Sequence, residues 1–186
     1  MSKKILLAGV IGGAVIFIWS FISHMLLPLG EAGIKTLPNE DAVIAALRDN
    51  AKEPAVYLFP GFMSSDMTAA QQAEYNQKRE QGPVGFLVYN PGSSPIMFPK
   101  RLMIELVTNI MSAIIAAFLL SQALGKLTGL GGRVLFVTLL GTVPFFVIDA
   151  SYWNWYDFPM KYVLAQLTDQ VVGFALAGVA MAKILK

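Results

Sequence analysis

The sequence predicts a mainly α-helical integral membrane protein, with four antiparallel transmembrane helices and a small α/β extramembrane insert between the first two. The chain of 186 residues is 55% hydrophobic and only 14% charged, with a mean hydropathy of +0.58. Soluble domains carry about 25% charged residues. In addition, four apolar stretches approach or exceed the roughly 20 residues needed to cross a bilayer. They cover 5–27, 102–124, 134–152 and 162–184.

The first stretch follows Lys3 and Lys4 and must be distinguished from a cleaved signal peptide. Its apolar run is longer than the ~7–15 residues usual in a signal peptide, and no small-residue cleavage site follows it. We therefore expect a retained transmembrane helix over 1–27, an extracytoplasmic insert over 28–101, and the remaining three transmembrane helices over 102–186.

The distribution of charge predicts the orientation. If the N-terminus is cytoplasmic, the cytoplasmic ends of the helices carry six basic residues and no acidic one: Lys3, Lys4, Lys126, Arg133, Lys183 and Lys186. The segments on the other side then carry eight basic and nine acidic residues. Short cytoplasmic loops rich in Lys and Arg follow the positive-inside rule. We therefore expect a bacterial-type, multi-pass inner-membrane protein with both termini cytoplasmic and the insert periplasmic.

Two helices are expected to alternate with two strands in the insert. A helix capped by Asn39 precedes a strand over 55–61, and a second helix over 68–82 precedes a strand over 84–92. This order suggests that the two strands pair in parallel through the second helix. Because this core is small, we expect the insert to depend for its stability on contacts with the membrane helices or with a partner. The proline-rich segment 90–99 is expected to be an extended tether, with partner docking along it as the alternative.

Several classes of chemistry lack support in the sequence. The chain has no cysteine, which excludes disulfides, thiolate metal sites and thiol nucleophiles. The glycines of the insert lack the spacing and the lysine of a phosphate-binding loop. No catalytic residue, cofactor or nucleic-acid partner is indicated. The partners we expect are membrane lipid and either a protein partner or further copies of this chain.

Each predicted membrane helix carries polar residues on one face. Since lipid cannot hydrogen-bond, these residues should face one another in the outer half of the bundle, while small residues line its inner half. Asp at the centre of a membrane helix costs about 2.5–3.5 kcal/mol on insertion scales. The candidate residues for ligand binding or proton relay are His24, Glu105, Asn109, Asp149, Gln166, Asp169 and Gln170. The small residues expected inside are Gly9, Gly13, Ala116 and Ala177.

The polar cluster has three interpretations. It can hold the helices together, as polar residues do in membrane bundles. It can bind a metal or cofactor, although one histidine and the absence of a Glu-x-x-His pair argue against a di-iron centre and against haem ligated by two histidines of this chain. It can relay protons or ions, or bind a small polar ligand. Pro144 is further expected to kink the third span and open a gap near Thr142 and Phe145.

Aromatic residues concentrate after the third span. Trp153, Trp155 and Tyr156 are expected in the outer loop at headgroup level, either as an interfacial belt or as a ring-lined site for a lipid or quinone headgroup. The function we expect is a non-catalytic accessory or assembly subunit that contacts a partner through the insert and the aromatic rim. The alternative is a small membrane carrier, or a metal- or cofactor-dependent membrane enzyme, that acts at the His24, Glu105, Asp149 and Asp169 cluster.

Overall fold

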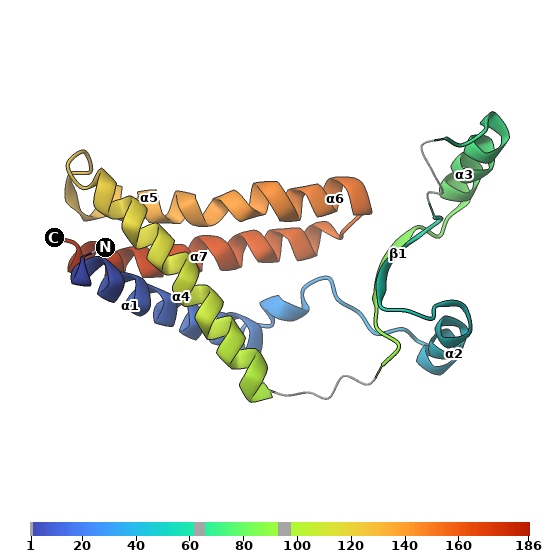
Figure 1. The fold of residues 1–186 in the computed structure, drawn as a ribbon, viewed down its shortest axis with the longest axis horizontal. Coiled ribbons are helices and arrows are strands. Elements are labelled where there is room, and N and C mark those ends of the chain that lie inside the picture. The colour runs from blue at the N-terminus through green and yellow to red at the C-terminus, as the bar shows by residue number, and fades with distance from the viewer. Residues whose placement is uncertain (1, 62–65, 93–97) are drawn as a thin grey trace. The chain divides into compact units, whose positions relative to one another are not determined.

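The computed structural model of the protein describes residues 2–61, 66–92 and 98–186 (Figure 1). It divides the chain into two compact units, a membrane unit of Met1–Ile34 with Ile96–Lys186, and the insert, Lys35–Pro95. The predicted fold class is confirmed: the protein is mainly helical, with four long apolar helices and a small two-stranded α/β segment between the first and second.

The four long helical spans belong to the membrane unit. The first is α1 (Lys3–Phe21), followed by the π-helical turn η1 (Ile22–Leu26) and the short 3-10 turn η2 (Leu29–Glu31). The second is α4 (Phe98–Ala123), and the fourth is α7 (Met160–Ile184). The third span joins α5 (Gly129–Pro144), the π-helical turn η3 (Phe145–Asp149) and α6 (Ala150–Tyr156). All four are long and apolar enough to cross a membrane, as expected of a multi-pass membrane protein.

Consecutive spans run antiparallel, and both chain ends lie at the same end of the membrane unit (Figure 1). Helix α1 packs against α4 on one side and α7 on the other, and α5 packs against α7. The helices therefore follow the packing order α4, α1, α7, α5. Helices α4 and α5 make few contacts with each other and diverge away from the loop that connects them (Figure 1).

The packed core of the membrane unit is built largely from small side chains, as predicted for the inner half. Gly9, Gly13, Ala116 and Ala177 are all buried. A Cβ at Gly9 would lie 2.6 Å from the Cα of Ile114 on α4, so the two backbones touch there. Larger side chains fill the spaces between the helices. Those in the core are Ile16, Leu120, Val137, Met181 and Leu185.

The insert contains α2 (Glu40–Asn50), β1 (Ala55–Phe59), α3 (Ala69–Gln81) and β2 (Gly85–Tyr89), in the predicted order. Asn39 occupies the N-cap of α2, although its side chain makes no capping hydrogen bond. Thr68 and Gln71 form a reciprocal capping box at the start of α3, and Gly82 follows the last residue of that helix.

The prediction of parallel strand pairing is wrong. β1 and β2 pair antiparallel, in a register that sets Ala55 opposite Tyr89 and Phe59 opposite Gly85. A parallel pair needs a crossover helix that packs its apolar face on the sheet. Helix α3 is polar and has no buried residue, so it cannot play that part. It lies instead beyond the end of the two-stranded ribbon (Figure 1). Half of the predicted tether, residues 93–97, lies outside the described residues.

Candidate functional site

His24 lies in the π-helical turn η1 at the end of the first span. Its Nδ1 is 3.0 Å from the backbone carbonyl oxygen of Ser20 and 2.9 Å from the hydroxyl of Ser23. The Ser23 hydroxyl itself donates to the Ser20 carbonyl at 3.1 Å. Because a carbonyl oxygen only accepts hydrogen bonds, the bond to Ser20 requires a proton on Nδ1. Nε2 is then the ring nitrogen that remains for a ligand.

Glu105 shares a cavity with His24. This cavity, of about 370 Å³, lies between α1 and α4, and both residues line it. Glu105 Oε1 accepts a hydrogen bond of 3.1 Å from Asn109 Nδ2 one turn further along α4. The remaining lining is mainly apolar and aromatic: Phe17, Ser20, Phe21, Met25 and Leu102. The cavity therefore combines an oriented imidazole and a carboxyl group with an apolar wall.

The turn η2 closes over the histidine ring. A Cβ on Gly30 would collide with His24 Cδ2, so a larger residue there would require the histidine side chain to move. Gly33 then adopts a φ of +82° and lies against the start of α7, where its Cβ would be 3.0 Å from the backbone nitrogen of Tyr162. These two glycines let the chain after the first span fold back onto the membrane unit.

Asp149 and Gln170 form a separate polar pair between η3 and α7. Asp149 is buried, with an exposed fraction of 8%. Its Oδ2 accepts a hydrogen bond of 2.8 Å from Gln170 Nε2. This bond joins the third span to the fourth, which is the role that interhelical polar residues play in membranes.

Asp169 lies next to Gln170 but takes no part in the bond to Asp149. Its backbone carbonyl accepts a hydrogen bond of 3.1 Å from the indole nitrogen of Trp19 on α1. Its side-chain Oδ1 and the Oε1 of Gln170 are buried, and no described residue donates to either atom. Gln166 lies one turn earlier on the same helix. In a lipid-like interior an acceptor without a donor is unfavourable.

Five of the seven predicted polar residues therefore form two groups, to which Gln166 and Asp169 do not belong. His24, Glu105 and Asn109 lie together between α1 and α4, whereas Asp149 and Gln170 lie between η3 and α7. Within the described ranges, no three His, Cys, Asp or Glu side chains gather closely enough to hold a metal ion. Asp149 was expected in one cluster with His24 and Glu105, but its carboxylate is bonded to Gln170 on α7.

The aromatic residues after the third span are helical rather than part of a loop. Trp153, Trp155 and Tyr156 belong to α6, which extends that span by about two turns beyond η3. The loop expected there shortens to the residues after Tyr156, where Asp157 adopts a φ of +57°. Trp153 and Trp155 are exposed on the surface of the membrane unit. Such a position suits either an interfacial belt or a ring-lined headgroup site.

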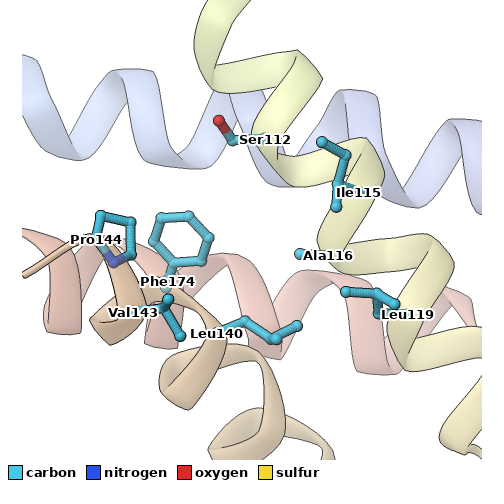
Figure 2. A pocket seen from close by; sticks show the side chains of 8 residues that line it. All are labelled: Ser112, Ile115, Ala116, Leu119, Leu140, Val143, Pro144 and Phe174. Carbon is cyan, nitrogen blue, oxygen red and sulfur yellow. The ribbon is translucent and has the colours of Figure 1, made fainter. Parts of the chain in front are cut away.

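The structure contains a cavity that the sequence indicated only in part. It lies between α4, α5 and α7, and Figure 2 shows the side chains that line it. Its volume is about 310 Å³, and its lining is almost wholly apolar. It lies beside Pro144, which cannot donate a backbone hydrogen bond and which directly precedes the π-helical turn. The lining from α5 consists of Leu140, Val143 and Pro144. The predicted neighbours Thr142 and Phe145 do not line it.

Further lining residues of the His24 cavity were missed, although the sequence contained a signal for them. Phe17, Phe21 and Met25 follow each other at steps of four, and Ser20 precedes His24 by the same step. This spacing places them on neighbouring strips of one helix.

Among known proteins, no family model matches this chain, and no curated protein or solved structure shows a significant similarity to it.

Proposed function

We propose that this protein is a non-catalytic accessory or assembly subunit of an inner-membrane protein complex, which binds a partner protein through its insert. The observation that carries the proposal is that the insert lacks a core of its own. Among the described residues of the insert, Ala51 alone is buried. A domain with so little buried surface depends on contacts outside itself.

The ribbon of the insert exposes an apolar face. Val56 and Val88 are directly paired across the strands, and Leu58 lies two residues along on the same face. All three are exposed, Val88 to 74%. An isolated two-stranded ribbon is marginally stable in water. The ribbon face of Val56, Leu58 and Val88 is therefore the surface through which we expect the insert to bind.

Site-specific photocrosslinking in native membranes tests this proposal. A photoreactive phenylalanine derivative at Val88 is expected to capture one polypeptide of defined mass, whereas the same group at Gln77 on the polar helix α3 is not. The variant Val56→Asp/Val88→Asp should lose that polypeptide on purification while its membrane unit keeps its unfolding temperature. Capture of lipid alone, or equal capture from Gln77, would contradict an accessory function through this face.

The second candidate function is a carrier or a cofactor-dependent enzyme that acts at the polar cluster. The observation that favours it is the orientation of His24, which is held through Nδ1 and lines a cavity shared with Glu105. If His24→Gln abolishes the activity of the complex that contains this protein, measured in native membranes, while the crosslinked partner remains bound, the function depends on the cavity. If partner binding and activity both survive, the accessory function stands.

A further inference from the structure

A third cavity lies at the end of the membrane unit where the two chain termini meet. It has a volume of about 270 Å³ and is formed by the start of α5 and the end of α7. Three of its lining residues are basic. The lining consists of Gly129, Leu130, Arg133, Ala182, Lys183 and Lys186. No acidic residue occurs in 106–148 or 170–186, the stretches that contain this lining.

Arg133 is fixed in this cavity by the backbone. Its Nε donates to the carbonyl of Leu127 at 3.4 Å, and one terminal nitrogen donates to the carbonyl of Leu185 at 3.2 Å. The guanidinium fork is thereby oriented before any ligand arrives, which lowers the entropy lost on binding. Its other terminal nitrogen makes no hydrogen bond to a described residue, so donor capacity remains for an anion.

The two lysines bring further positive charge that the protein does not neutralise. Lys183 and Lys186 are exposed, and neither forms an ion pair or a side-chain hydrogen bond with the described residues. Basic residues at the end of a helix also interact favourably with its dipole. That effect accounts for Lys183 in the last turn of α7 and for the bond from Arg133 to the terminal carbonyl of Leu185. It does not require that Arg133, Lys183 and Lys186 converge on one cavity.

We infer that this cavity binds the headgroup of an anionic phospholipid in the leaflet on the side of the chain termini. The phosphodiester would bond to the remaining terminal nitrogen of Arg133, with Lys183 and Lys186 around it, because guanidinium and ammonium groups bind phosphate. The cavity lies at the ends of two apolar spans, the depth at which headgroups lie. Exposed Leu130 in the lining offers an apolar contact for an acyl chain, which free phosphate would not use.

Native mass spectrometry of the detergent-solubilised full chain tests this inference. On titration with phosphatidylglycerol, we expect one lipid to be retained more tightly than the rest, and phosphatidylcholine not to replace it. The variant Lys183→Gln/Lys186→Gln should weaken this binding by about five-fold for each lysine removed. Both lysines are exposed, so the variant should keep the unfolding temperature of the parent protein.

The matched control is Lys3→Gln/Lys4→Gln, which removes the same charge at the same end of the membrane unit without altering the cavity. This control should retain the tightly bound lipid. Equal weakening by both variants would overturn the inference, because it would indicate general attraction to a basic surface. Displacement of the lipid by millimolar inorganic phosphate would overturn it as well, because the cavity would then bind phosphate rather than a lipid.

Discussion

At the residue scale, Asp149 and Asp169 differ in how their carboxyl groups are satisfied. The Asp149 carboxylate accepts a hydrogen bond from Gln170 across two spans, whereas Asp169 Oδ1 is buried with no donor among the described residues. Removing one partner of a buried bond leaves the other unsatisfied, whereas removing an unsatisfied atom relieves a penalty. The two aspartates should therefore respond in opposite ways to the same substitution.

We expect Asp149→Ala to lower the free energy of unfolding by about 0.6–1.7 kcal/mol, which extends from the average to the largest value measured for interhelical hydrogen bonds in a membrane protein. Asp169→Ala should leave stability unchanged or raise it. Thermal unfolding in detergent measures both, and a double-mutant cycle with Gln170→Ala isolates the Asp149 bond. A larger loss from Asp169→Ala than from Asp149→Ala would show that Asp169 has a stabilising partner outside the described chain.

At the element scale, the crossing of α1 and α4 depends on glycine. Gly9 allows the α1 backbone to touch that of α4 at Ile114, and Gly13 does the same at Ile110. Gly131 in the first turn of α5 has no atom within 4 Å of its Cβ position. The same substitution of glycine by alanine would therefore place a methyl group against a packed backbone at Gly9 and in open space at Gly131.

Gly9→Ala should destabilise the membrane unit, because its new methyl group would collide with Ile114 on α4. Gly131→Ala should be neutral or stabilising by up to about 1 kcal/mol, because alanine has the higher helix propensity. Unfolding temperatures of the two variants, measured in the same detergent, compare these effects. If Gly9→Ala proved as stable as Gly131→Ala, the two helices would not be in backbone contact.

The elements of the insert were predictable because their signals are local. Thr68 and Gly82 delimit α3, and short runs of aromatic and aliphatic residues identify both strands. The direction of pairing was not predictable in the same way, since it depends on whether α3 packs on the sheet. Of the two π-helical turns, η3 follows Pro144, but η1 contains no proline. A shift in backbone hydrogen bonding of this kind leaves no trace in the periodicity of hydrophobic residues.

At the scale of the whole molecule, charge placement predicts that the insert and the loop between α4 and α5 lie on opposite sides of the membrane. The absence of cysteine makes this simple to measure with Gln77→Cys in α3 and Thr128→Cys in that loop. In intact cells a membrane-impermeant maleimide should label Gln77→Cys only. Thr128→Cys should react after permeabilisation. The reverse pattern would invert the orientation.

The sequence predicted which residues share a helix face, but it did not predict which helices are neighbours. His24 and Glu105 were expected at the same depth, and they do line one cavity. Asp149 was expected among them, yet it bonds to α7 because α5 packs there and not on α1. Four helices with similar polar stripes are compatible with several packing orders. The choice among them depends on small-residue contacts such as Gly9 with Ile114, which are decided only in three dimensions.

The packing order has a consequence for synthesis. Helix α7 lies between α1 and α5, yet the ribosome makes it after both. The hairpin of α1 and α4 can assemble as soon as α4 is inserted. Helix α5 has few packing contacts with these two helices, so it gains its main packing partner only when α7 is inserted. We therefore expect the third span to remain largely exposed to lipid until the fourth span is inserted. Final assembly of the membrane unit is a late event, completed when the fourth span is inserted between its two neighbours.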